Sequence, residues 1–261
     1  MHQVTSSDSF ELRSELFEAY VDEGIGVIHL KGSVFDIATD LSLKQAFFKK
    51  IHLADIMPNI EVLLMLSDES AMGEEKHAQF IKMIIESHDK GSDIFQEENA
   101  LSQFIKLMCG FDKIIVSGVR GSVVGAFFGT ILATDHRIAS DSTVFSFPHV
   151  RYQMPPQGAL AFYLSKHLGI GKAKQILLDG KSLTAYEAYK LGLIDKIVEN
   201  NDFQQHCIEI AKTILQVSSR VVHMKKQVRR FDLEILEHYF EVDTKLATKY
   251  RIKMPLDENN Q

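Results

Sequence analysis

Four features are scarce in this 261-residue sequence, and each scarcity excludes a class of protein. Two cysteines, Cys109 and Cys207, provide neither a disulfide framework nor a zinc site, so no metal is expected. The longest uncharged run, residues 121–134, contains three glycines and is too short to cross a bilayer. Positively charged residues are fewer than negatively charged ones, and the resulting formal net charge of −6 opposes general binding to nucleic acid. Residues 1–11 include acidic side chains where a signal peptide would have an apolar core, which predicts a cytoplasmic protein without membrane attachment.

The order of apolar and polar segments predicts an α/β domain. Apolar, β-branched runs alternate with amphipathic stretches up to residue 198, and only helical patterns follow. We therefore predict a polar lead-in over residues 1–23, a core over 24–200 and a helical region over 201–261. Strands are predicted at residues 24–30, 60–66, 114–116, 136–139, 143–145 and 193–198. Helices are predicted at residues 41–51, 74–88, 100–109 and 127–134, in a segment through His167, at residues 170–178 and after a capping box of Thr184 and Glu187. Residues 88–99 are predicted to be a charged loop, and residues 202–249 are predicted to be helical with a hinge near Ser218-Ser219.

The stretch from Ile114 to Arg137 is the centre of this pattern. A buried strand leads into a turn with two glycines, and Gly125-Ala126 then begins an uncharged helix. The backbone N–H groups at the start of such a helix have no partner within the helix, and they suit a developing negative charge on a ligand oxygen. A plain contact of small residues between helix and sheet would produce the same pattern.

Two runs resemble the crotonase (enoyl-CoA hydratase/isomerase) family: G-V-R-G-S-V-V-G-A-F-F-G-T-I-L-A-T-D-H-R-I-A and G-I-G-K-A-K-Q-I-L-L-D-G-K-S-L-T-A-Y-E-A-Y-K-L-G-L-I-D-K-I-V. The resemblance covers residues 24–230. It implies a spiral of ββα turns, also found in Clp-type proteases, and a homo-oligomer that is a trimer or a hexamer. The implied ligand is a thioester of coenzyme A or of a carrier protein, with no separate bound cofactor.

The resemblance also assigns an oxyanion hole. It implies one backbone amide at Ala126, where the family commonly has glycine, and another at Glu74, after Gly73. Gly73, Gly125, Gly129 and Pro148 then fall in the substrate-binding segments. Two such donors stabilise an enolate formed from the thioester carbonyl.

This chain differs from the family pattern at the two positions where the hydratases have their acid and base. Their glutamates fall on Gly129 and on His149, the latter in F-S-F-P-H. His149 has a pKa range suited to proton transfer near neutral pH, and a structural histidine is the alternative. A carboxylate could also come from Asp68, Glu69, Glu74 or Glu75, and a substrate carboxylate could meet Ser146 or Arg151, although solvated surface residues explain these side chains more simply.

Three cations, Lys225, Lys226 and Arg229, fall where the family often places charges near the CoA phosphates. A solvated helix face explains the same cluster.

These observations favour two functions and disfavour two others. The first is an enzyme that stabilises a thioester enolate and uses His149 for proton transfer, with isomerase, decarboxylase or lyase chemistry favoured over hydration. The second is a binding protein that keeps the fold without the catalysis. A serine peptidase is disfavoured because Val123 occupies the nucleophile position and Ser122 is one residue away. A dinucleotide oxidoreductase is disfavoured because the third glycine and the acidic ribose ligand are missing.

Overall fold

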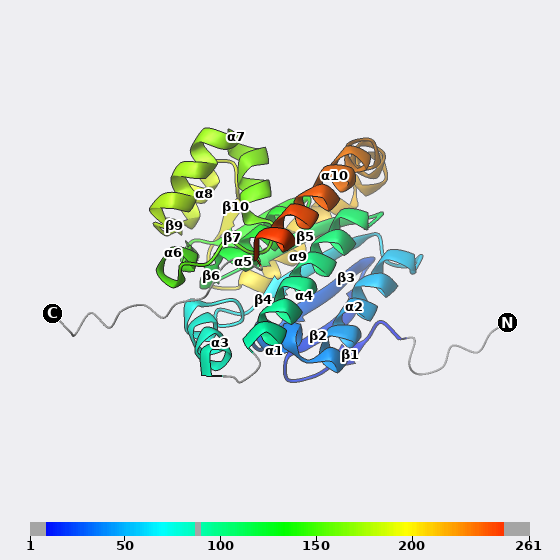
Figure 1. Ribbon diagram of the computed structural model, residues 1–261. Helices are drawn as coiled ribbons and strands as arrows, with labels where there is room; N and C mark the ends of the chain where they lie inside the picture. The colour runs from blue at the N-terminus through cyan, green and yellow to red at the C-terminus, as the bar shows by residue number, and fades with distance from the viewer. Residues whose placement is uncertain (1–8, 87–89, 248–261) are drawn as a thin grey trace.

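A computed structural model describes residues 9–86 and 90–247 of the chain (Figure 1). The side chains at residues 84–85, 90–99, 228–232, 244 and 246–247 lie outside this description. The strands are β1 Leu12–Arg13, β2 Phe17–Asp22, β3 Ile25–Leu30, β4 Val62–Ser67, β5 Ile114–Val119, β6 Ser122–Val124, β7 His136–Ser140, β8 Val144–Ser146, β9 Leu183–Thr184 and β10 Lys196–Val198. The helices are α1 Val34–Thr39, α2 Leu41–Ile56, α3 Glu74–Glu86, α4 Lys90–Gly110, α5 Gly125–Leu132, α6 His149–Tyr152, α7 Leu160–Asp179, α8 Ala185–Lys190, α9 Phe203–Leu215 and α10 Ser218–Ala247.

The strands form two sheets. The larger has the order β1-β2-β3-β4-β5-β7-β10, and the smaller has the order β6-β8-β9. Strands β3, β4, β5, β7 and β10 run parallel, whereas β1 and β2 are antiparallel additions at one edge. The carboxyl ends of β3, β4 and β5 therefore meet at one edge of the sheet, where the loops that carry the predicted oxyanion residues begin.

The central strands are apolar because helices cover both faces of the large sheet. Every residue of β3, β4 and β5 is buried. One face packs against a core that includes Phe47 of α2 and Ile105 of α4, and the other packs against Phe203, Cys207 and Ala211 of α9. In Figure 1, α2 and α4 lie across one face of the sheet. This arrangement confirms the predicted α/β class with helices at the C-terminal end.

Several local predictions are also confirmed. The Thr184 hydroxyl accepts a hydrogen bond from the Glu187 amide, and the Glu187 carboxylate accepts one from the Thr184 amide, which completes the capping box. The break in the C-terminal helices lies between Leu215 and Ser218. The predicted boundary near residue 200 falls between β10 and α9, but α9 packs on the large sheet. Within the described residues, no helix is both long and apolar enough to cross a membrane.

Two predictions of secondary structure were wrong. Residues 12–13 and 17–22, placed in a polar lead-in, form β1 and β2. Phe17 and Ala19 are buried while Glu18 and Tyr20 are half-buried, so the alternation of a strand was present in a segment rich in charge. The second error is the charged loop at residues 88–99, because α4 already begins at Lys90. A charged segment can be helical when the turns that follow supply the buried face, and Leu101, Ile105 and Met108 supply it here.

Candidate active site

The two loops with the predicted oxyanion amides lie against each other. The amide of Val124, which ends β6, donates to the Met72 carbonyl at 2.9 Å, directly before Gly73. The Glu74 amide makes one long hydrogen bond, at 3.4 Å, to the Ser122 hydroxyl. Segments about fifty residues apart in the sequence are thus joined through β6. Ser122, the serine next to the peptidase nucleophile position at Val123, lies against the Glu74 backbone amide.

The second amide belongs to the first turn of a buried helix. All eight residues of α5 are buried, and the N-cap residue Val124 makes no side-chain hydrogen bond to the first turn. The first N–H groups of a helix have no acceptor within the helix, so the Ala126 amide is available to a ligand oxygen. The positive end of the helix dipole favours negative charge at this point, although a helix of two turns contributes modestly.

Four of the predicted site residues line one small cavity of about 20 Å³, which is room for about one water molecule. They are Gly125, Ala126, Pro148 and His149. The cavity is completed by Val124, His77, Leu160 and the turn over residues 154–157. The structure therefore brings together the start of α5 and the start of α6, which the sequence separates by more than twenty residues.

Gly129 is a packing position and does not line this cavity. A Cβ atom on Gly129 would lie 2.0 Å from the Gly158 carbonyl oxygen, and a Cβ on Gly158 would lie 1.9 Å from the Ala126 carbonyl oxygen. Gly158 also has a positive φ of 65°, which favours glycine. The backbones of α5 and of the turn before α7 are thus in direct contact. No side chain fits at residue 129, so a glutamate there requires the backbone to move.

His149 is held in one orientation by a backbone carbonyl. Its Nε2 lies 3.1 Å from the Leu177 carbonyl oxygen, and a carbonyl can only accept, so Nε2 carries the proton. The neutral ring then keeps its lone pair on Nδ1. Burial lowers the pKa of His149, and the hydrogen bond to Leu177 opposes this effect. His149 is therefore neutral at pH 7 and able to accept a proton at Nδ1.

A second histidine, His77, lines the same cavity and was not predicted. It lies in the first turns of α3 and is only 5% exposed. Its ring packs against Phe35 and Tyr152, with centroid distances of 5.6 and 5.5 Å. Burial lowers the pKa of His77 to about 4, and the charges of Arg151 and His149 act in the same direction. The local sequence E-E-K-H-A-Q-F gives no signal of this role, because the neighbouring side chains that bury His77 come from elsewhere in the chain.

The carboxylates near the Glu74 loop have other partners. The Glu74 side chain pairs with Arg151 at 2.6 Å, and Glu69 accepts a hydrogen bond from Asn200 at 2.8 Å. Arg151 is largely exposed and links α6 to the start of α3. Ser146 is buried on β8, and its hydroxyl has no hydrogen-bond partner within the described part of the chain.

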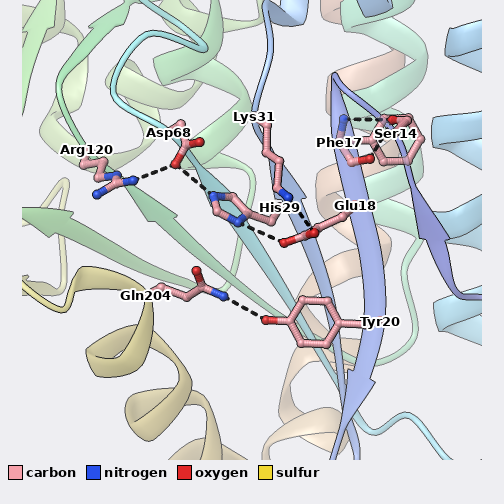
Figure 2. Close-up of polar contacts among 9 residues, drawn as sticks. All are labelled: Ser14, Phe17, Glu18, Tyr20, His29, Lys31, Asp68, Arg120 and Gln204. Atoms are coloured by element: carbon pink, nitrogen blue, oxygen red, sulfur yellow. Dashed lines mark hydrogen bonds and ion pairs between the residues drawn. The ribbon is translucent and has the colours of Figure 1, made fainter.

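Asp68 belongs to a polar cluster at the carboxyl ends of β3, β4 and β5 (Figure 2). Its Oδ1 lies 2.6 Å from Arg120 and 3.0 Å from Nε2 of His29, whose Nδ1 lies 3.5 Å from Glu18. Burial opposes ionisation of Asp68, but Arg120 and His29 outweigh it and hold the pKa of the carboxyl below its usual value. The pair of Asp68 and Arg120 thus connects the loop before Gly73 with the turn before β6.

The basic cluster of α10 lies away from this site. Lys225 donates to the Lys113 carbonyl and to Asp135, both at 2.7 Å, and Lys226 pairs with Asp112 at 3.5 Å. These partners precede β5 and β7, so the two lysines lie at the opposite edge of the sheet from Glu74. The side chain of Arg229 lies outside the described residues. A contact between these cations and CoA phosphates stays a prediction.

A second cavity, of about 60 Å³, is lined by residues next to both predicted oxyanion positions. Its lining includes Met72, next to Gly73, and Phe127, next to Ala126, together with Phe47, Phe48 and Phe104. The lining is almost entirely apolar. Within residues 9–86 and 90–247, no group of three or more His, Cys, Asp or Glu side chains is placed to hold a metal ion.

The fold and this pair of loops define a protein of the crotonase class. The crystal structure of enoyl-CoA hydratase from Bacillus halodurans has the same fold, with a TM-score of 0.75 and 20% sequence identity over 89% of this chain and 93% of that one. Residues 81–257 match the sequence model of the family described as enoyl-CoA hydratase/isomerase. The chain belongs to the enoyl-CoA hydratase/isomerase family.

Two relatives show how far the similarity extends. The chain is 29% identical over 136 residues to the short-chain-enoyl-CoA hydratase of Clostridium acetobutylicum, covering 52% of this chain and 50% of that protein. It is 29% identical over 130 residues to the peroxisomal enoyl-CoA delta isomerase 3 of Mus musculus, covering 50% of this chain and 41% of that protein. The matched region thus spans about half the length of these curated relatives or less.

Proposed function

We propose that this protein binds an acyl-CoA or acyl-carrier thioester and stabilises its enolate with the backbone amides of Glu74 and Ala126. The observation that carries the proposal is the backbone contact between the two loops that hold these amides, next to a cavity lined by His149. Two preorganised N–H donors act most strongly where charge develops on the carbonyl oxygen. The apolar cavity behind Met72 and Phe127 supplies a place for the acyl chain.

Isomerase, decarboxylase or lyase chemistry fits this site better than hydration. Hydration requires a positioned acid and base that move a water molecule across a double bond. At the two positions where the resemblance places glutamates, Gly129 has no room for a side chain and His149 is a neutral imidazole. A reaction in which an enolate is formed and then protonated needs fewer acid–base side chains than hydration does. His149 is the proposed proton-transfer residue.

A binding protein without catalysis is the second candidate. The small volume of the cavity that Ala126 and His149 share, about 20 Å³, supports it, because this cavity must widen before a thioester bound at the Ala126 amide reaches the histidine, although His149 also lines a larger pocket of about 600 Å³ with Lys174 and Leu178. We also propose a homo-oligomer, a trimer or a hexamer, as the family resemblance implies, and a cytoplasmic location, which the two lone thiols fit.

A panel of thioesters tests the proposed function. At a concentration of about one hundred times Kd, a bound acyl-CoA is expected to raise the melting temperature by about 5 °C or more. We expect no hydration of crotonyl-CoA above the rate without enzyme, as followed by its absorbance. The panel includes butyryl-, octanoyl- and methylmalonyl-CoA, with free CoA as the control. A protein that no thioester stabilises contradicts the proposal, and rapid hydration of crotonyl-CoA contradicts the assignment of the acid–base positions.

The link between Asp68 and Arg120 gives a second prediction. Arg120→Met is expected to weaken binding of the stabilising thioester about tenfold, because the loop with the Glu74 amide loses its tie to the turn before β6. The free energy of unfolding should fall by only about 1 kcal/mol, since both partners are partly exposed. Titration calorimetry and thermal unfolding measure the two effects.

Lys31→Met is the matched control for this variant. Lys31 pairs with Glu18 at 2.6 Å on the far side of the same cluster. Its loss should leave thioester affinity unchanged. Equal affinities of wild type and Arg120→Met would show that this ion pair does not position the loop.

A further inference from the structure

The position of His77 relative to the proposed oxyanion hole suggests a catalytic role. Its amide donates to the Gly73 carbonyl at 3.1 Å, so the histidine stands one helical turn after the Glu74 amide. Its imidazole lines the cavity that Ala126 and His149 also line. One helix start thus provides a proposed oxyanion donor and, one turn later, a titratable ring at the same cavity.

One nitrogen of the His77 ring has no partner in the described part of the fold. Its side chain is 5% exposed, and Nδ1 has no hydrogen-bond partner among the described residues. Buried polar atoms without a partner are rare, because their removal from water is not compensated. The rings of Phe35 and Tyr152 hold the imidazole in place without satisfying Nδ1. What distinguishes His77 from other histidines with a buried, unpartnered Nδ1, such as His206, is that it lines the cavity of Ala126 and His149.

Burial, together with the positive charge of Arg151, lowers the pKa of His77 and keeps the ring neutral. Arg151 and His149 are the charged or titratable groups that act on it, and both disfavour a proton on the ring. The carboxylate of Glu74, on the same helix, is paired with Arg151. No carboxylate among the described residues forms an ion pair with His77, so a lone pair on the ring stays available.

We propose that His77 is a second proton-transfer residue that removes a proton from the α-carbon of the bound thioester. The C–H bond breaks, its electron pair moves to the carbonyl oxygen as an enolate, and a ring nitrogen of His77 takes the proton. The two backbone amides hold the enolate oxygen, and a proton returned to carbon regenerates a neutral thioester. This inference rests on the proposed function, because it requires that a thioester binds at Glu74 and Ala126.

Exchange of the α-protons of butyryl-CoA in D₂O tests the role directly. Wild-type protein is expected to incorporate deuterium at the α-carbon, as measured by mass spectrometry. His77→Phe should reduce the exchange rate about 100-fold or more, which is the usual range for loss of a general base. Its affinity for butyryl-CoA, measured by calorimetry, should change less than threefold. Phe is chosen because an apolar ring fits between Phe35 and Tyr152, and His77→Gln provides a second, smaller and polar variant.

His206→Phe is the matched control. Its Nδ1 is likewise buried without a partner among the described residues, but it lies on α9, away from the cavity. The control should keep the wild-type exchange rate. Unchanged exchange in both His77 variants would overturn the role of His77 and leave the proposed function standing. Wild-type protein that binds butyryl-CoA without exchange would also overturn it and would favour the binding protein, whereas a lack of any thioester binding would refute the proposed function itself.

Discussion

Gly129→Ala is expected to lower the melting temperature by about 10 °C, which corresponds to about 3 kcal/mol in a chain of this size. The new Cβ atom would lie 2.0 Å from the Gly158 carbonyl oxygen and 2.9 Å from the amide nitrogen of Leu160. Both atoms belong to the backbone, so no side-chain rotation relieves the contact, and α5 must move away from the turn before α7. The melting temperature by circular dichroism measures the effect.

Gly171→Ala is the matched control for this substitution. Gly171 lies exposed in α7, and a Cβ added there meets no atom within 4 Å. Alanine favours a helix over glycine by about 1 kcal/mol, so this variant should be as stable as wild type or more stable. A Gly129→Ala protein with the melting temperature of wild type would show that the two glycines are not in contact. If the contact is present, a glutamate at residue 129 cannot restore a hydratase site by itself.

Ala126→Pro is expected to abolish stabilisation by the thioester. Proline removes the backbone N–H that the proposed enolate oxygen accepts from, and loss of one such donor costs about 3–4 kcal/mol in transition-state binding. The fold should survive, because this N–H belongs to the first turn of α5, where it has no acceptor within the helix. The preceding residue, Gly125, has no Cβ and tolerates a following proline better than other residues. The measurement is the shift in melting temperature with and without the thioester.

Two further variants serve as comparisons for Ala126→Pro. Ala126→Gly keeps the N–H and should keep the thioester shift. His149→Ala should bind the thioester nearly as wild type does while its turnover falls, because proton transfer affects only the chemical step. A folded Ala126→Pro protein with the wild-type thioester shift would contradict the oxyanion assignment. Unchanged turnover in His149→Ala would reduce that histidine to a structural role.

The apolar runs of the sequence predicted most of the central sheet because these strands are covered on both faces. Ile114–Val119 and Val62–Ser67 are buried at every position, so their hydrophobicity is continuous and does not depend on register. The strand at Phe17–Asp22 was missed because it lies near the edge of the sheet and carries charged residues. Its identity depends on pairing with β3, in which Glu18 lies opposite His29.

The site was only partly predictable for a similar reason. The helix start at Gly125 and Ala126 is a local feature of strand, turn and helix, and His149 follows from its place after Pro148 in the family pattern. His77 has no such signal, because its burial is produced by Phe35 and Tyr152. The pairing of Lys225 with Asp135 was equally unpredictable, because the two residues are 90 positions apart in the sequence.

The sequence by itself determined the central buried strands, the capping box at Thr184 and the family of the chain. These depend on patterns within one segment, where hydrophobic period, glycine position and hydrogen bonding between near neighbours are fixed by the residues themselves. Only the tertiary structure decided that Gly129 meets Gly158, that Asp68 is tied to Arg120 and that a neutral His77 lines the same cavity as Ala126. Such contacts join residues far apart in the chain, and the burial that controls packing and proton affinity exists only after those segments have come together.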